Sequence, residues 1–508
     1  MKPIDVFLTQ IQAFLQPTQV ITDPTECAHY AQDWSAVLTP NSPAIVFPET
    51  TAQVSQILST ANDLGIAVIP SGGRTGLSGG AVATQGEVVL SLIRMNFIRD
   101  LHLGALTVHV GAGAITQAVH DFCEPHGVTW PVDFASKGSS CVGGNIATNA
   151  GGVRVLRYGN TRNWILGLTA VTMDGNVHEF NGELEKNNTG YDLRQLMIGS
   201  EGTLAAVTEA TLKLAPLPKS RAVFFFALDN FSSVIELFAF ARARIASLSA
   251  FECMDRPCLQ KTMEHFQLKA PVNLGNASGA PDALAAESDS AETGAKAFVL
   301  MEVENAVLDD CEVWLNDIFE AGLVLDGVMA QNEREAKELW HYREGIAEAV
   351  LAGHSVHQED VSVPVARLAE FYSEIHSRYQ KAFKMEEITS QTTNAPSTPI
   401  ESPASNHAQV YFFGHIGDGN LHIFIQGPKT DADESTRKKF LSEAKVADLE
   451  LFQVLKQYSG SISAEHGIGL LKRHAIHFSR SEPEIALMRG MKKVFDPKGL
   501  LNPGKVFE

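Results

Sequence analysis

The glycine-rich segment Pro70-Ser-Gly-Gly-Arg-Thr-Gly-Leu-Ser-Gly-Gly80 is the first strong indication of how this chain folds. It lies between two short apolar runs and contains five glycines and three hydroxyl side chains. Glycine has no Cβ, so a loop of this kind can bring its N–H groups close to phosphate oxygens. The stretch is neither a Walker loop nor a Rossmann turn, since it lacks the glycine spacing and the lysine that define them. Taken alone, it is equally compatible with an ordinary glycine-rich loop.

Two further glycine clusters follow in the same part of the chain. Lys137–Gly152 combines small residues with side-chain amides, so a flat ring can lie against its backbone. Asn188–Thr203 supplies Gly199, Glu201 and Gly202 just before an apolar strand. Three such loops in one domain favour a shared binding function over coincidence.

Length and composition bound the class of protein. The chain has 508 residues, 44% hydrophobic and 19% charged, which predicts two or three domains with a substantial core. Its 40 basic and 59 acidic residues give a net charge of −19. A surface this acidic repels polyphosphate backbones, so nucleic acid is not an expected partner.

Neither a membrane span nor a secretory signal is expected. The densest apolar run, Val223–Leu228, is strand-sized, whereas a spanning helix needs about 18 or more apolar residues. Near the N-terminus, Ile4, Phe7, Ile11 and Phe14 have the spacing of a packed amphipathic helix. The six cysteines are too few for a disulfide framework, and no Cys-x-x-Cys occurs. These features predict a cytoplasmic protein with reduced thiols.

The sequence changes character near Pro216. Before it, β-rich runs alternate with glycine clusters and two predicted helices, Thr51–Leu64 and Ile115–Glu124, which is typical of an α+β domain built around loops. After it, strands and helices alternate in a second, α/β domain, with a helix predicted across Asn332–Ala352. The segments 273–296 and 386–408 lack periodicity and are predicted to be mobile surface insertions.

Together with the three loops, Leu156–Gly159 and the closing Phe495–Lys505 resemble the flavin-dependent oxidoreductases of the vanillyl-alcohol-oxidase type, in the branch of D-2-hydroxyacid dehydrogenases. That branch includes D-lactate, glycolate and D-2-hydroxyglutarate enzymes. The resemblance begins at about Pro43 and implies an α+β fold: a two-part, PCMH-type FAD-binding domain, an α/β substrate (cap) domain and a C-terminal segment that returns to the flavin. The expected divisions are an N-terminal helical segment (1–40), the FAD-binding domain (41–219), the substrate domain with a metal-binding hairpin (220–460) and the C-terminal helical segment that completes the active site (461–508).

The resemblance implies FAD as the cofactor, with its diphosphate on the first loop and its isoalloxazine on the second. Some members of the wider family tether the flavin through a histidine in the first loop. That loop has no histidine here, so FAD is expected to be non-covalent. The implied FAD-binding residues are Pro70, Ser71, Gly72, Gly73, Arg74, Thr75, Gly76, Ser78, Gly143, Gly144, Thr148, Asn149, Gly152, Glu201, Gly202 and Asn502.

A metal site is predicted from Gly414-His-Ile-Gly-Asp-Gly-Asn-Leu-His422. Its glycines and aspartate mark a tight turn, which can bring His415 and His422 to one side of a hairpin. Two imidazoles suit Zn²⁺, or Mn²⁺ when oxygen ligands join. For the third ligand the resemblance singles out Glu465. Each histidine alone is more often a hydrogen-bonded structural residue, but its combination with Glu465 and the flavin loops favours the metal.

Oxidation of a 2-hydroxy acid requires the hydroxyl proton to leave as the Cα hydride moves to flavin N5. A metal that holds the hydroxyl and carboxylate oxygens lowers the pKa of that hydroxyl. His466 is adjacent to the implied ligand Glu465 and has an ordinary pKa of about 6.5, so it is the expected base. The alternative is that His466 only orients a ligand.

Arg343 is the expected holder of the substrate carboxylate. It lies on a predicted helix, where the resemblance places such a group, and its guanidinium offers a bidentate fork. The alternative is a surface ion pair with Glu344 or another acid. Lys472 is a weaker second candidate.

Three positions depart from the pattern of the 2-hydroxyglutarate enzymes. Ala347 replaces a hydroxyl residue, Gln358 a lysine and Phe424 an asparagine. The changes remove one cation and two hydrogen-bonding groups, so a distal carboxylate is held less well. The sequence of the FAD domain, particularly Leu156–Gly159 and Asn187–Thr203, nevertheless resembles the 2-hydroxyglutarate group most. D-2-hydroxyglutarate, D-lactate and related D-2-hydroxy acids therefore remain open as substrates.

The preferred hypothesis is a metal-assisted, FAD-dependent D-2-hydroxyacid dehydrogenase that passes electrons to a quinone or an electron-transfer flavoprotein. Two alternatives are a metal-dependent hydrolase with a nucleotide-binding domain and a non-catalytic flavoprotein subunit of a larger oxidase complex. A subunit without catalysis has no need for both a metal site and a base, which disfavours the last. The identity of the metal and the oligomeric state, a homodimer among the options, are left open.

Overall fold

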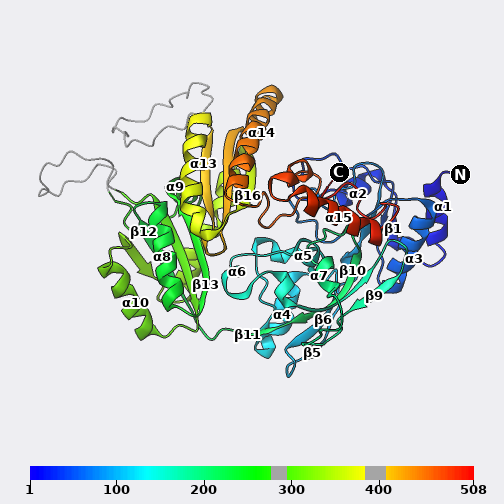
Figure 1. The fold of residues 1–508 in the computed structure, drawn as a ribbon, viewed down its shortest axis with the longest axis horizontal. Helices are drawn as coiled ribbons and strands as arrows, with labels where there is room; N and C mark the ends of the chain where they lie inside the picture. The colour runs from blue at the N-terminus through cyan, green and yellow to red at the C-terminus, as the bar shows by residue number, and fades with distance from the viewer. Residues whose placement is uncertain (276–293, 384–407, 508) are drawn as a thin grey trace, which may run out of the picture. The chain divides into compact units, whose positions relative to one another are not determined.

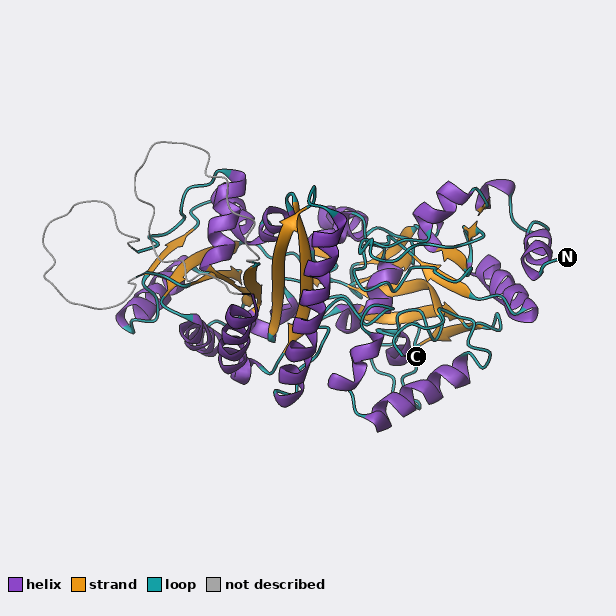
Figure 2. Ribbon diagram, turned by 90° about the horizontal axis from the view of Figure 1, so that it is seen from above, coloured by secondary structure: helices purple, strands orange, loops and turns teal. Residues whose placement is uncertain are grey.

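The computed structural model describes residues 1–275, 294–383 and 408–507, and these form two compact units. Unit 1 comprises Met1–Leu217 and Ser463–Glu508, and unit 2 comprises Pro218–Ile462 (Figure 1). The N-terminal and C-terminal segments, which the sequence sets apart, both belong to unit 1. In each unit the strands run through the interior with helices around them (Figure 2). Residues 276–293, the central part of the first predicted insertion, and residues 384–407, which include all of the second except residue 408, lie outside the described residues.

The first sheet of unit 1 carries the first glycine loop at the end of one of its strands. Helix α3 (Thr51–Leu64) packs its apolar face on this sheet, as its periodicity predicts, and Thr50 caps it by accepting the Gln53 N–H. The C-terminal segment joins the same sheet through a parallel bridge between Leu501 and Val68. The strand order is β1 (Val20–Ile21), β2 (Ile45–Val46), β4 (Val88–Ser91), β3 (Val68–Ser71), with β2 and β3 parallel to β4.

The other two glycine loops pack against a second, antiparallel sheet in unit 1. Its order is β5 (Ile98–His102), β6 (Thr107–Gly111), β10 (Ala206–Lys213), β8 (Ile165–Val171), β9 (Val177–Phe180), and the short β7 (Val128–Thr129) and β11 (Ala215–Pro216) pair separately. The other helices of unit 1 are α1 (Pro3–Ile11), α2 (Pro24–Tyr30), α4 (Thr116–Cys123), α5 (Val142–Thr148), α6 (Val155–Tyr158), α7 (Arg194–Met197) and α15 (Glu482–Phe495).

Unit 2 is built on one seven-stranded sheet in which every pairing is antiparallel. Its order is β15 (Asp326–Met329), β12 (Arg221–Leu228), β14 (Ala297–Glu304), β13 (Leu248–Asp255), β17 (Gln409–His415), β18 (Asn420–Lys429), β16 (His354–Ser362). The helices are α8 (Phe231–Arg244), α9 (Arg256–Phe266), α10 (Leu308–Glu320), α11 (Glu333–Glu344), α12 (Ile346–Leu351), α13 (Leu368–Phe383) and α14 (Glu434–Gln457).

The single helix predicted across Asn332–Ala352 is wrong, because the structure has two helices that meet at Gly345. A Cβ at this position would lie 2.7 Å from Cε2 of Phe266, so only glycine allows α9 to pack this closely against the junction. All six cysteines are buried and free, in agreement with the prediction of reduced thiols. Among the described residues, none of the helices has the length and apolar character that crossing a bilayer requires.

Candidate active site

The first glycine loop is packed tightly against the second. A Cβ on Gly73 would lie 2.1 Å from the Ser139 carbonyl oxygen, so only glycine fits where the two backbones meet. Arg74 has a φ of +58°, and its guanidinium donates to the His29 carbonyl and lies over the Tyr30 ring. Its side chain is thus held by α2. The loop itself is lined by backbone and small side chains, as the cradle of a diphosphate requires.

Two buried polar atoms at this loop have no hydrogen-bond partner among the described residues. They are Oγ of Ser71, at the end of β3, and Oδ1 of Asn502. The Asn502 amide donates to the carbonyls of Gly80 (3.1 Å) and Glu201 (2.6 Å), so it joins the first and third loops. Buried polar atoms are normally satisfied, and unsatisfied ones at a glycine-rich loop indicate a missing polar ligand. The residues present therefore fit FAD.

The second loop supplies helix α5. The Thr148 hydroxyl donates to the Gly144 carbonyl (3.1 Å), and Asn149 ends the helix in the left-handed region with a φ of +53°. The Asn149 side-chain oxygen accepts the Arg162 N–H at 3.0 Å. A Cβ on Gly144 would meet no atom within 4 Å, so open space adjoins the helix at this residue. A flat ring has room there.

Glu201 ties the third loop to the C-terminal segment within unit 1. Its carboxylate accepts the N–H groups of Ile468 and Gly469, each at 2.8 Å. Burial raises the pKa of Glu201, although these two hydrogen bonds act against the rise. The Ser78 hydroxyl of the first loop also donates to the His466 carbonyl at 2.8 Å. The backbone that carries His466 is thereby fixed to two of the predicted FAD loops.

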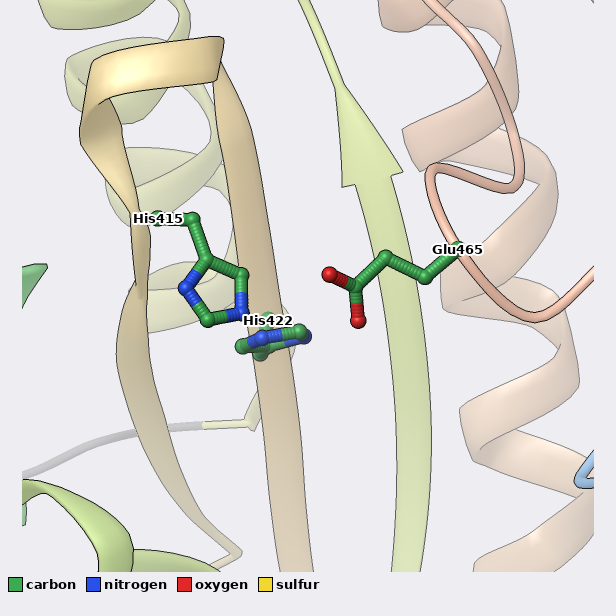
Figure 3. Close-up of side chains that lie close together, drawn as sticks. All are labelled: His415, His422 and Glu465. Atoms are coloured by element: carbon green, nitrogen blue, oxygen red, sulfur yellow. The ribbon is translucent and has the colours of Figure 1, made fainter. Parts of the chain in front are cut away.

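Figure 3 shows the two predicted metal-ligating histidines on neighbouring strands of unit 2. His415 ends β17 and His422 lies on β18, and the predicted turn joins the strands at Ile416–Asp418. The hairpin pairs Phe413 with His422 and brings the two imidazole centroids to 5.1 Å, with their planes nearly perpendicular. The prediction that the turn brings both histidines together is confirmed.

A carboxylate holds one nitrogen of each imidazole. Nδ1 of His415 lies 2.8 Å from Oε1 of Glu252, and Nδ1 of His422 lies 3.3 Å from Oδ1 of Asp360. A carboxylate at one ring nitrogen of a histidine is the arrangement common behind metal-ligating histidines. Burial lowers the pKa of His422 to about 4, so that ring is neutral and can act as a ligand. These donors fit a divalent ion such as Zn²⁺ or Mn²⁺.

Arg343 is buried beside this pair and forms an ion pair that the sequence does not reveal. Its Nε donates to Oε2 of Glu252 at 2.9 Å, and its guanidinium carbon lies 4.9 Å from the centre of the Phe413 ring. Glu252 therefore bridges Arg343 and His415. Burial alone would raise the pKa of Glu252, but His415 and Arg343 hold it below its ordinary value. The alternative partner, Glu344, is not the one that the structure records.

Sequence reasoning missed Glu252 and Asp360. Glu252 lies between apolar residues in the middle of the fully buried strand β13, and a buried charge in such a position is a signal for a paired or ligating group. Asp360 has no comparable signal, because its neighbour Glu359 is also acidic. Their register with His415 and His422 appears only in the folded sheet.

The remaining predicted residues divide between the units. Every predicted FAD-binding residue belongs to unit 1, and so do Glu465, His466 and Lys472. Gln358 and Phe424 are directly opposed on β16 and β18 in unit 2, where α12 carries Ala347.

Two family models match the chain. The FAD binding domain matches residues 42–181, and the C-terminal domain of FAD linked oxidases matches residues 217–506. D-2-hydroxyglutarate dehydrogenase of Xanthomonas citri pv. viticola is 40% identical over 99% of this chain and 97% of its own length. The mitochondrial D-2-hydroxyglutarate dehydrogenase of Bos taurus is 34% identical over 96% of this chain and 81% of its own length.

Solved structures share the fold at low sequence identity. 4-Ethylphenol oxidase from Gulosibacter chungangensis aligns with a TM-score of 0.72 at 17% identity, over 99% of this chain and 97% of that one. p-Cresol methylhydroxylase aligns with a TM-score of 0.70 at 14% identity, over 99% and 96%. The family matches exclude the alternative that the chain is a metal-dependent hydrolase with a nucleotide-binding domain. The chain belongs to the FAD-linked oxidases of the vanillyl-alcohol-oxidase type, in the branch of D-2-hydroxyacid dehydrogenases, and is an FAD-dependent oxidoreductase that acts on CH–OH groups.

Proposed function

We propose that this chain oxidises a D-2-hydroxy acid to the 2-oxo acid with the help of a divalent metal. The observation that carries the proposal is the Glu252 bridge, which joins an arginine suited to a carboxylate with an imidazole suited to a metal. D-2-hydroxyglutarate is the substrate that the relatives' names give, and D-lactate is the shorter alternative.

The metal ligands in this proposal are His415, His422 and Glu465, the three side chains labelled in Figure 3. When bound, FAD supplies an acceptor for the Cα hydride, and the ion supplies a Lewis acid for the substrate hydroxyl and carboxylate oxygens. Glu252 and Asp360 hold the two imidazoles in the orientation that ligation needs.

Arg343 binds the substrate carboxylate through its terminal nitrogens. Its Nε is used by Glu252, and the described residues provide no hydrogen bond to Nη1 or Nη2. A guanidinium fixed at Nε presents these two nitrogens in one plane, which suits a carboxylate. The ring of Phe413 beneath the guanidinium keeps it in place.

His466 accepts the hydroxyl proton. The oxidation releases one proton from the hydroxyl and one hydride from Cα, so a base must be present when the hydride leaves. The hydrogen bond from Ser78 to the His466 carbonyl fixes the backbone of the base to the first FAD loop. The base thus keeps its position relative to the predicted diphosphate cradle.

The test is anaerobic reduction of the flavin by a panel of D- and L-2-hydroxy acids, with metal-replete protein. We expect one D-acid to bleach the oxidised-flavin absorption. His466→Ala should retain the flavin spectrum and lose bleaching by about 100-fold or more. His474→Ala, in the same segment, is the matched control. An unchanged rate in His466→Ala would exclude the base, and protein without any flavin would overturn the proposal.

The proposal also includes predictions of the electron acceptor, the oligomeric state and the cellular location of the protein. A quinone or an electron-transfer flavoprotein remains the predicted acceptor. The homodimer and the cytoplasmic location also stay predictions from the sequence, while the relative from Bos taurus is named as mitochondrial.

A further inference from the structure

The sheet face that carries His422 continues past the metal ligands into a patch of uncharged side chains. Residues that face each other across antiparallel strands share one side of the sheet, as do residues two apart along a strand. Asp360 is opposite His422, and one step further Gln358 is opposite Phe424. On the other side of β18, Tyr411 is opposite Phe424. We call Gln358, Phe424 and Tyr411 the distal patch.

A substrate held at the metal ligands and Arg343 has one direction in which its side chain can extend along this face. In the other direction the strands end at the turn Ile416–Asp418, where the Asn420 amide already donates to Oδ1 of Asp360 at 2.7 Å. The strands run on only toward the distal patch. The Phe413 and Phe424 rings, with centroids 5.0 Å apart, form the start of that path.

Among the described residues, strands β16, β17 and β18 carry no cation along this path that matches a second carboxylate. The residues of β16, β17 and β18 on this face include neither lysine nor arginine between the histidines and the end of the distal patch. Arg343 lies beside it, but its Nε is paired with Glu252 and its terminal nitrogens are assigned to the carboxylate of the 2-hydroxy acid group itself. The next side chain along β18, Gln426, accepts from the Tyr411 hydroxyl (3.2 Å) and donates to the Val350 carbonyl (2.6 Å), so both ends of its amide are used.

Unlike Gln426, Gln358 has an amide that is available to a substrate. Its amide has no hydrogen bond among the described residues, and the residue is only partly buried. It can donate one neutral hydrogen bond to a substrate. Burying a carboxylate against aromatic rings with a single neutral donor is costly, whereas an alkyl or aryl group gains from the same contact.

We infer that the distal patch makes this chain prefer D-2-hydroxy acids with an uncharged, largely apolar side chain over dicarboxylic ones, with Gln358 and Phe424 as specificity-determining residues. The inference rests on the proposed function and narrows its substrate class. It ranks D-2-hydroxyglutarate below acids of the same length without a distal charge.

The experiment compares D-2-hydroxyglutarate with D-2-hydroxy-5-methylhexanoate, in which an isopropyl group replaces the distal carboxylate at nearly the same size. Anaerobic flavin reduction by the full-length, FAD-loaded protein gives the rate constant over Kd for each acid. We expect the uncharged acid to be favoured by about tenfold or more. Binding of the two matching 2-oxo acids, read from shifts of the flavin absorption bands, should give the same ranking without turnover.

Two variants test the role of Gln358. Gln358→Lys introduces a cation and should move the ratio of the two rate constants toward D-2-hydroxyglutarate by about tenfold or more. Gln358→Met has similar size and no charge, and should not move it in that direction. If Gln358→Lys fails to retain FAD, the inference is tested by comparing the two acids in the unaltered protein.

The outcomes separate the inference from the proposed function. Equal or better reduction by D-2-hydroxyglutarate in the unaltered protein would overturn the inference and leave the function standing. A flavin that no 2-hydroxy acid reduces would remove both.

Discussion

His357 lies between two carboxylates on the side of the unit 2 sheet opposite to His422. Its Nε2 is 2.7 Å from Oδ1 of Asp448 on α14 and 3.6 Å from Oε1 of Glu359, its neighbour on β16. Burial by itself lowers the pKa of His357, but the hydrogen bonds and charges of Asp448 and Glu359 raise it to about 9. The imidazolium form is therefore the folded-state form at neutral pH, and we expect it to hold α14 on the sheet.

The contribution of the His357 imidazolium to the free energy of folding follows from the difference between its pKa in the folded and the unfolded chain. Raising the pKa from its ordinary value of 6.5 to about 9 corresponds to about 3 kcal/mol of folding free energy. Because the folded pKa is the higher one, this contribution is fully present below pH 6.5 and is lost as the pH rises through about 9. His357→Gln should therefore cost about 3 kcal/mol at pH 6 and less than about 1 kcal/mol at pH 9.

Urea unfolding at several pH values measures this loss. The difference between the unaltered protein and His357→Gln should shrink steadily from pH 6 to pH 9. His354→Gln is the matched control, because His354 lies on the same strand but hydrogen-bonds the Ala352 carbonyl. A cost that stays constant across this pH range would refute the reasoning, since the ion pair would then not depend on the proton of His357.

Three further outcomes are expected. Gly73→Ala should lose most bound FAD, seen as a lower ratio of flavin to protein absorbance, because its Cβ would collide with a backbone carbonyl of the second loop, whereas Gly138→Ala, whose Cβ meets nothing within 4 Å, should retain it. Arg343→Lys should keep the flavin spectrum but slow its reduction by about tenfold or more, since lysine cannot bind Glu252 and a substrate carboxylate in one plane. Glu201→Gln should lower the free energy of unfolding by about 1–3 kcal/mol, because one of two backbone N–H groups loses its acceptor.

Much of the fold could be predicted because its signals are local. The apolar spacing of Thr51–Leu64 defines α3 to the residue, and the glycines and aspartate after His415 define the turn of the hairpin. The helical periodicity alone does not predict the break at Gly345, where an added Cβ would collide with the Phe266 ring of α9. Contacts of this kind bring together residues far apart in sequence, and periodicity carries no information about them.

The candidate site likewise has a part that local sequence signals predict and a part that depends on contacts between residues far apart in sequence. His415 and His422 belong to one short motif, so their meeting on adjacent strands is predictable. Glu252 lies 163 residues before His415, and only the strand order of the unit 2 sheet makes them neighbours. The carboxylates that contact the rings of the two proposed metal ligands were missed for this reason.

The division of the chain has a consequence for catalysis. The groups proposed to hold the substrate in unit 2 are Arg343 and the two histidines, and Glu252 couples Arg343 to His415. The proposed base, His466, belongs to unit 1, where its carbonyl is bound by Ser78 of the first FAD loop. In the proposed reaction the base and the first FAD loop therefore keep one geometry within unit 1, because a single hydrogen bond joins the backbone of His466 to that loop.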